Sequence, residues 1–390
     1  MNAIHEGILL LMKSAVTGES YALPEGFLMD EAYEVIKRHN IVSLAYDGAV
    51  KCGVAKDLPV MQEMFRTYLR ILMHSEGQMR AIDEVCRAFD ASGIDYMPLK
   101  GCNLKNMYPK PELRQMGDAD ILIKKEQYDI IRPQMQKMGF TEVMESDHEL
   151  VWKRKDLYLE LHKHLIPSYN KDYYAYFGNG WRLAKKAEGT RYILAPEDEF
   201  IFIFTHFAKH YRDAGAGCRY VLDLWVYKRK HPGMDEAYIT GELEKLQLKD
   251  FYENIMRLMK VWFEGAMPDE KSEFITGFIL EGGTWGCREY RNLASEVKNA
   301  NSTGSAKRGK VKTVLQAFFP SAQAISGLFP VLRKAPWLLP LFWPVRWVST
   351  LLFRPENVRR RSRELRENTS DVVSAYHESL RYVGLDFNFK

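Results

Sequence analysis

Apolar residues recur every three to four positions along the N-terminal part of the chain, which is the pattern of amphipathic helices. The pattern is clear in 30–50 and 58–80, and it continues without a change of period through 76–93. Gly93 follows the last periodic position, where glycine commonly ends a helix. We therefore predict a helical region over residues 1–75 and a further helix that leads out of it.

The hydrophobic pattern changes after Gly93. Short apolar runs that are typical of strands alternate with two segments of helical period, the first of which is broken by Pro109 and Pro111. This order predicts an α+β core with a small mixed β-sheet over residues 76–190, flanked by N-terminal and C-terminal helical regions. The strand segments are 94–99, 118–125 and 149–165 (one or two strands), and the helical segments are 102–108 and 126–140.

Helical periodicity returns in 196–213 and 218–231, on either side of an Ala-Gly-Ala-Gly loop. We predict that residues 191–298 form a helical domain that closes over the sheet. The stretch 299–312 is rich in Asn, Ser, Gly and Lys, which is the composition of a polar linker. It would connect the helical domain to an apolar and basic helical tail over residues 313–390.

The 390 residues have an ordinary composition, with 46% hydrophobic and 27% charged residues and a net charge of +4. The charge is uneven, because residues 301–390 hold 15 Lys or Arg and 6 Asp or Glu, a net charge of +9. The other 40 basic and 45 acidic residues leave a net charge of −5 in residues 1–300. The weakly acidic body argues against long nucleic acid as a partner, whereas the tail suits a polyanion or an anionic surface. A solvated basic helix is the alternative for the tail.

Two carboxylates stand at the start of the second predicted strand. Because alternate residues of a strand share a face, Asp118 and Asp120 point the same way, roughly 7 Å apart. In the later segment DLYLELHKHL, three leucines share one face, and Glu160 lies on the opposite face with His162 and His164. If these strands are neighbours, their three carboxylates can hold two Mg²⁺ ions, which would activate an attacking oxygen and stabilise a leaving phosphate oxygen.

A basic turn precedes the aspartates. Lys100 and Gly101 follow the first predicted strand, and Arg114 lies just before the second. A glycine at a strand-to-helix turn lets backbone N–H groups approach a phosphate. The two basic side chains could neutralise a triphosphate. The ordered set of Lys-Gly, Arg, Asp-x-Asp and a later acid therefore indicates chemistry on a phosphate ester.

This ordered set resembles the nucleotidyltransferase superfold that DNA polymerase beta and the minimal nucleotidyltransferases share. More narrowly, the segments PLKGCNLKNMYP, ELRQMGDADILI and LELHKHL are similar to motifs of the family described as uncharacterised nucleotidyltransferases, over about residues 76–230. The resemblance implies that Asp118, Asp120 and Glu160 hold the Mg²⁺ ions. It also implies that Gly101 belongs to the phosphate-binding turn.

The resemblance extends to two later helices. The family has a His-bearing helix followed by a helix with a basic residue and an Asp-Leu pair, which implies that His206, Arg219 and Asp223 line the cleft opposite the carboxylates. His206 and His210 lie four residues apart, so a zinc site is one alternative, although Phe207 stands where the metalloprotease pattern has Glu. An ordinary helix ion pair is the alternative for Arg219 and Asp223.

The implied activity is Mg²⁺-dependent transfer of a nucleoside monophosphate from a nucleoside triphosphate to an acceptor hydroxyl, with release of pyrophosphate. The acceptor could be a small molecule, a sugar, a protein side chain or an RNA end. Cys102 follows Gly101, where the superfold prefers Gly or Ser, so a non-catalytic nucleotide-binding or sensing protein is one alternative. The other is a metal-dependent phosphohydrolase that uses His162 or His206.

The expected location is cytoplasmic. The five cysteines form no Cys-x-x-Cys pair, which argues against a disulfide framework or a Cys-based zinc site. The first residues lack the features of a signal peptide, and no stretch reaches about 18 uncharged apolar residues. In 313–363, Trp and basic residues alternate with apolar ones, a composition that suits peripheral contact with a membrane. Packing of this segment onto the core is the alternative.

Overall fold

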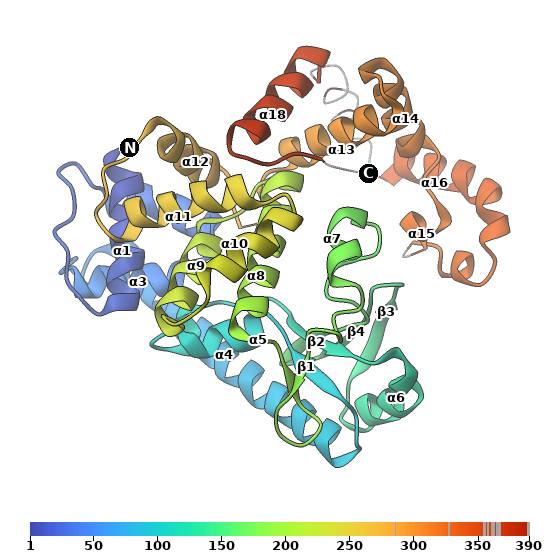
Figure 1. Cartoon of the computed structure of the whole chain (residues 1–390), viewed down its shortest axis with the longest axis horizontal. Helices are drawn as coiled ribbons and strands as arrows, with labels where there is room; N and C mark the ends of the chain where they lie inside the picture. The colour runs from blue at the N-terminus through green and yellow to red at the C-terminus, as the bar shows by residue number, and fades with distance from the viewer. Residues whose placement is uncertain are drawn as a thin grey trace. The chain divides into compact units, whose positions relative to one another are not determined.

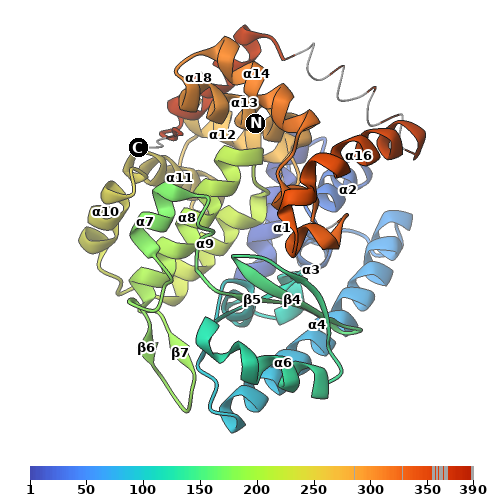
Figure 2. The same cartoon turned by 90° about the vertical axis from the view of Figure 1, so that its right-hand side faces the viewer.

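The computed structural model describes every residue of the chain except 285, 327, 354–355, 357–358, 360–362, 364–367 and 388–390. The chain divides into two compact units. The first comprises Met1–Tyr211 and Gly215–Gly286, and the second comprises Arg212–Ala214 and Cys287–Lys390. Figure 1 labels their helices and strands, and Figure 2 gives the view after a quarter turn.

A five-stranded mixed sheet belongs to the first unit, with the strand order β1-β2-β5-β4-β3. β2 runs parallel to β5, and the other neighbouring strands are antiparallel. The structure confirms the predicted α+β class, with a small mixed sheet between N-terminal and C-terminal helical regions. The strands are β1 (Tyr96–Pro98), β2 (Ala119–Ile123), β3 (Thr141–Glu145), β4 (Glu149–Arg154) and β5 (Leu157–His162), and β6 (Lys185–Lys186) pairs separately with β7 (Tyr192–Ile193).

The described residues of the first unit outside these strands are mainly helical, and the last turn of α8 reaches into the second unit. The α-helices are α1 (Ala3–Thr17), α2 (Met29–Arg38), α3 (Val42–Lys51), α4 (Pro59–Ala91), α5 (Gly101–Leu104), α6 (Tyr128–Lys137), α7 (Lys171–Phe177), α8 (Pro196–Ala214), α9 (Cys218–Lys230), α10 (Glu236–Lys245), α11 (Lys249–Phe263) and α12 (Glu270–Glu281). The short 3₁₀ helices are η1 (Lys105–Met107), η2 (Pro111–Leu113) and η3 (Lys125–Gln127).

The two faces of the five-stranded sheet differ in character. Ile121 of β2 and Leu159 of β5 belong to a buried cluster with side chains of α4 and α6, which cover that face. Asp120 and Glu160 alternate to the opposite face, because successive side chains of a strand point in opposite directions. β2 and β5 pair in a register that sets Asp120 beside Glu160. The two strands are therefore neighbours, which was the condition for their acids to meet, and the leucines of β5 point inward as predicted.

α8 separates an aromatic face from a polar one. Phe204 and Phe207 pack against Phe251 of α11, with ring centroids 5.6 and 5.5 Å apart. Residues three and four apart share one side of a helix, so His206 and His210 lie together on a different side from this cluster. The packing of α8 on α11 therefore fixes which of its side chains are free to line a cavity.

The structure departs from three details of the predicted organisation. α4 is continuous through residue 75, so the predicted boundary falls inside a helix. β3 was not predicted, because most of its side chains are exposed and it lacks an alternating apolar face. The predicted linker 299–312 is helical on both sides of a tight turn, where Gly304 adopts a left-handed conformation with φ +64°. Polar composition alone does not distinguish a solvated helix surface from a linker.

His39, which follows α2, ties the N-terminal helices to later parts of the first unit. The backbone N–H of Cys218 donates to His39 Nδ1 at 3.3 Å, and His39 Nε2 lies 3.2 Å from the carbonyl oxygen of Leu280. Together these bonds require a neutral ring with its proton on Nε2. Burial lowers the pKa of His39 to about 4.

We expect this histidine to make folding sensitive to mild acid. As the pH falls from about 6.5, the unfolded chain takes up a proton that the folded chain binds only near pH 4. The free energy of unfolding should therefore fall over this window, by about 3 kcal/mol at most, for this residue alone. Urea unfolding of the wild type and of His39→Asn across the window measures the difference.

The exposed His74 of α4 provides a matched control. The pH dependence of stability should be shallower in His39→Asn than in the wild type, and unchanged in His74→Asn. Equal slopes for the wild type and His39→Asn would show that His39 is not held neutral in the folded protein.

The second unit is helical. Its residues 213 and 298 form an ion pair, in which Lys298 Nζ lies 2.9 Å from Asp213 Oδ2. None of the described helices has the length and hydropathy that crossing a bilayer requires. Part of the basic run 359–363 lies outside the described residues. The helices are α13 (Arg288–Thr303), α14 (Ala306–Phe318), α15 (Ala322–Ile325), α16 (Leu339–Phe353) and α18 (Ser370–Tyr382), with 3₁₀ helices η4 (Pro330–Arg333) and η5 (Pro336–Leu338).

Candidate active site

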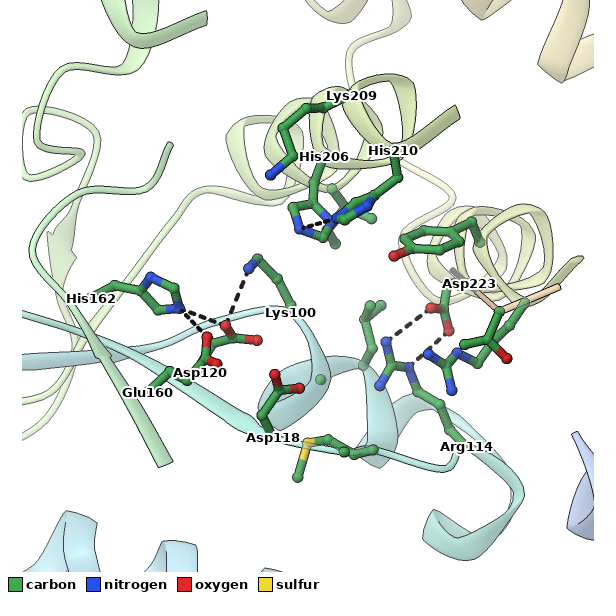
Figure 3. Close-up of a pocket in the computed structure, with 18 of the residues that line it drawn as sticks. Lys100, Arg114, Asp118, Asp120, Glu160, His162, His206, Lys209, His210 and Asp223 are labelled. Atoms are coloured by element: carbon green, nitrogen blue, oxygen red, sulfur yellow. Dashed lines mark hydrogen bonds and ion pairs between the residues drawn. The ribbon is translucent and has the colours of Figure 1, made fainter. Parts of the chain in front are cut away.

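A cavity of about 370 Å³ lies in the first unit between the polar face of the sheet and helices α8 and α9. Figure 3 shows the sheet carboxylates facing His206 and Lys209 of α8 across this space. Every residue that the sequence analysis named for metal or nucleotide binding lines the cavity, although those residues are spread over 124 positions of the chain. They are Lys100, Gly101, Arg114, Asp118, Asp120, Glu160, His206, Arg219 and Asp223.

The three predicted metal ligands come together at the paired strands. Asp120 lies in β2, with Glu160 of β5 as its neighbour across the parallel pairing. Asp118 precedes the first residue of β2, so it belongs to the approaching turn and not, as predicted, to the strand. It still lines the same cavity as the other two acids. All three carboxylates therefore face one space.

The carboxylates carry opposing pKa shifts. Burial opposes the charge of Asp120, but Lys100 and His162 outweigh it and lower the pKa of this carboxyl. Burial, followed by the charges of Asp118 and Glu149, raises the pKa of Glu160 to about 9. Burial and the charge of Asp120 also raise the pKa of Asp118. Crowding and burial of the three carboxyl groups thus disfavour the charged forms of two of them, and a divalent cation would offset that repulsion.

His162 joins this carboxylate group. Its Nε2 lies 2.6 Å from Asp120 Oδ1 and 3.6 Å from Glu160 Oε2, so these three side chains could bind one metal ion. The other ring nitrogen, Nδ1, lies 3.0 Å from His148 Nε2. His148, Glu149 and His162 form a second group with metal-ligand spacing. The two groups combine carboxylate oxygens with imidazole nitrogens, and the carboxylate oxygens are ligands that suit Mg²⁺ or Mn²⁺.

His148 and Glu149 are cavity residues that the sequence analysis missed. They enter because β4 runs antiparallel to β5 in a register that sets Glu149 beside His162. Burial lowers the pKa of His148 to about 2, which keeps its ring neutral. In the sequence, these two residues appear only as a His-Glu pair before an apolar strand segment. Such a pair does not show which strand will lie beside that segment.

The turn after β1 brings Lys100 over the carboxylates. Lys100 has φ +42°, an uncommon value for a residue with a side chain, and its Nζ lies 3.2 Å from Asp120 Oδ1. Gly101 packs closely on Met116, since a Cβ there would lie 2.7 Å from the sulfur of that side chain. Cys102 turns away from the cavity, and its buried thiol lies 3.5 Å from the backbone oxygen of Asp120. The turn therefore offers the Lys100 ammonium and backbone, and no hydroxyl, to the cavity.

Arg114 is held by an acid from a distant part of the chain. Its Nε and Nη2 donate to the two carboxylate oxygens of Asp223, each at 2.9 Å, and both side chains are buried. Tyr108 donates its hydroxyl proton to the same carboxylate at 2.8 Å. The ion pair suggested for Arg219 and Asp223 is thus replaced by one between Arg114 and Asp223. Arg219 donates to the backbone oxygen of Gln115 at 2.7 Å.

Histidine and lysine side chains of α8 form the side of the cavity that lies opposite the carboxylates. The Nε2 atoms of His206 and His210 lie 3.1 Å apart, and the ring of Tyr220 lies near both. Burial, reinforced by the charge of Lys100, lowers the pKa of His206 well below its usual range. Lys209 lines the cavity beside them. This wall can donate hydrogen bonds to an anion placed between it and the carboxylates.

Comparison with known families supplies an independent finding. A family model described as an uncharacterised nucleotidyltransferase matches residues 25–264. The match spans the five-stranded sheet, α8 and α9, and it contains the nine cavity residues given above as predicted for metal or nucleotide binding. A search of curated proteins found no match, and a search of solved structures found none either.

Proposed function

The chain belongs to the uncharacterised nucleotidyltransferase family, and from this premise we propose that it transfers a nucleoside monophosphate from a nucleoside triphosphate to an acceptor hydroxyl. The main observation in support of this proposal is the cavity in which Asp118, Asp120 and Glu160 face the histidine and lysine side chains of α8. Carboxylates suit divalent cations, and cationic side chains suit phosphates. A metal-bound triphosphate needs carboxylates on the side of its metal ions and cationic side chains on the side of its phosphates.

In this proposal, Asp118, Asp120 and Glu160 would hold the divalent ions. The ions, when bound, supply charge that stabilises the attacking and leaving oxygens of the phosphoryl group. The acceptor oxygen forms a bond to the α-phosphorus while the bond from that phosphorus to the bridging oxygen breaks, and pyrophosphate leaves. The acceptor proton goes to a carboxylate of the cavity, and we assign this role to Glu160, which lines the cavity beside Asp120.

The cations of the cavity would position the triphosphate. Lys100 lies beside the carboxylates, where its ammonium can bridge between Asp120 and a phosphate oxygen. Lys209 and Arg219 line the same cavity on α8 and α9. Arg114 is already engaged by Asp223, so we assign it the role of fixing α9 against the turn before β2. His206, whose pKa burial lowers, would present a neutral ring that can donate a single hydrogen bond.

The test is transfer of label. The purified protein is incubated with Mg²⁺ and each of the four α-labelled nucleoside triphosphates, alone and with a cell extract. The proposal expects label to move from one nucleotide to an acceptor with release of pyrophosphate, and no transfer by Asp118→Asn/Asp120→Asn. Release of inorganic phosphate without an acceptor would indicate a phosphohydrolase, and nucleotide binding without transfer in any extract would indicate a sensing protein.

Binding of Mg²⁺ should release a proton from Glu160. Because the pKa of this carboxyl is about 9 without metal, it carries a proton at neutral pH that the cation must displace. We expect release of about one proton per protein molecule, and an affinity that rises as the pH approaches 9. Titration calorimetry in two buffers with different ionisation enthalpies measures the number of protons released.

Glu160→Gln serves as the control, because an amide has no proton to release at this position. Its binding heat should depend less on the buffer than the heat of the wild type does. If the two proteins release the same number of protons, Glu160 is not the group that the cation displaces.

A further inference from the structure

Helix α16 in the second unit has its apolar side chains on the outside. Leu341, Val345, Val348 and Leu352 are spaced by four, three and four residues, which places them along one face of the helix. We call these four residues the outer stripe. Their exposed fractions are 67%, 52%, 55% and 69%, and α16 contains no buried residue. An ordinary surface helix turns such a stripe toward the core.

The polar groups of α16 point the other way, toward the end of α14. The indole nitrogens of Trp343 and Trp347 donate to the backbone oxygens of Pro320 and Phe318, at 3.0 and 2.8 Å. Arg346 donates to the backbone oxygen of Ala317 at 3.1 Å. These bonds fix the rotation of the helix, since turning the outer stripe inward would break all three. The exposure of the stripe is therefore built into the unit.

α14 repeats the arrangement. Val311, Leu315 and Phe318 follow the same spacing and are 58%, 51% and 53% exposed. Trp337, just before α16, is 77% exposed. Two helices that are joined by hydrogen bonds (labelled α14 and α16 in Figure 2) thus each carry an exposed apolar face. Several large apolar side chains exposed on two neighbouring helices indicate a site of interaction.

The charge around these faces selects the kind of partner. Residues 297–355 contain nine Lys or Arg and no Asp or Glu. Among them Lys307 and Arg308 on α14 and Lys334 before α16 are exposed. A partner must therefore be negatively charged and must also accept aliphatic and aromatic side chains.

Three partners can be compared on these two requirements. A second copy of the chain that contacted this surface through its own α14 and α16 would bring the same positive charge and would be repelled. A nucleic acid would neutralise the basic residues and leave the apolar faces in water. An anionic bilayer accepts both, because its acyl-chain boundary takes up Leu, Val and Trp while its headgroups pair with Lys and Arg.

We propose that the segment from α14 to α16, residues 306–353, docks on the surface of an anionic phospholipid bilayer through the outer stripe and the exposed face of α14. The helix lies in the interface and does not cross it, in keeping with the absence of a spanning helix among the described residues. The proposal does not depend on the proposed transferase activity, because the cavity residues and the docking residues belong to different units.

Sedimentation with vesicles tests the proposal on the full chain. Vesicles of phosphatidylcholine alone are compared with vesicles of equal parts phosphatidylcholine and phosphatidylglycerol, at low and high salt. We expect the wild type to sediment with the anionic vesicles and to be released by salt. Val345→Glu/Val348→Glu should weaken vesicle binding by about tenfold or more, because it removes apolar contact and adds repulsion.

Val372→Glu is the matched control, since Val372 is 43% exposed on α18 of the same unit and lies outside the proposed docking segment. It should bind vesicles as the wild type does. Circular dichroism checks that each variant is folded; the substituted side chains are exposed, so folding should be retained. Lack of binding to anionic vesicles, or equal binding by the stripe variant, would overturn the proposal. A dimer in sedimentation equilibrium that the stripe variant loses would assign the surface to a second copy instead.

Discussion

Asp120→Asn is expected to abolish measurable nucleotidyl transfer, with a loss of about 10³-fold or more. The pKa of the Asp120 carboxyl is lowered, and its side chain contacts Lys100 and His162. Asp120 also lies beside Glu160 across the strand pairing. An amide removes the negative charge that a divalent ion needs, and a loss of about 4 kcal/mol in stabilising the reacting phosphoryl group corresponds to about 10³ in rate.

The measurement is the initial rate of label transfer at saturating nucleotide, with Asp129→Asn as the matched control. Asp129 is an exposed aspartate at the start of α6, on the opposite side of the sheet from the cavity. It should transfer label at the wild-type rate. Transfer by Asp120→Asn within about tenfold of the wild type would remove this residue from the reaction, and with it the central argument for the metal site.

Asp223→Asn is expected to lower the free energy of unfolding by about 3–5 kcal/mol. Arg114 and Asp223 are both buried and joined by two hydrogen bonds of 2.9 Å, so removing the carboxylate charge leaves a buried guanidinium without its counterion. Tyr108 keeps a polar partner in the amide, which limits the loss to the charge interaction. Urea unfolding followed by tryptophan fluorescence measures the change.

Two further variants separate the ion pair from general damage. Arg114→Met/Asp223→Leu removes both charges and should cost less than Asp223→Asn, because no uncompensated charge remains. Glu76→Gln breaks the exposed pair with Arg80 on α4 and should change the free energy of unfolding by about 0.5 kcal/mol or less. If Asp223→Asn costs no more than Glu76→Gln, the buried pair does not hold α9 to the turn before β2.

Several features of the site were predictable from local patterns. Successive side chains of a strand point to opposite faces. Because the Ile and Leu residues beside Asp120 and Glu160 belong in the core, these two acids must lie on the polar face. The close packing at Gly101 likewise agrees with a glycine predicted at a strand-to-helix turn. Such features depend on residues within a few positions of one another, and the sequence displays those residues directly.

Other features depend on contacts between distant segments. Arg114 was predicted to neutralise phosphate, and Arg219 and Asp223 to line the cleft, with an ion pair between those two as the alternative. The pair between Arg114 and Asp223 was not foreseen, because it bridges 109 residues and forms only when α9 packs beside the turn before β2. His148 and Glu149 join the cavity only through the register of β4 against β5. Several registers and packings satisfy the same alternation of apolar residues, so the local pattern does not select one of them.

By itself, the sequence determined the α+β class, the strands that carry the acids and the family to which the chain belongs, since periodicity and short motifs encode these locally. The tertiary structure decided which charges meet. It paired Arg114 with Asp223, set Lys100 on Asp120 and turned the stripe of α16 outward. The physical reason is that pairing energies depend on burial and geometry, and both arise only when distant segments pack together.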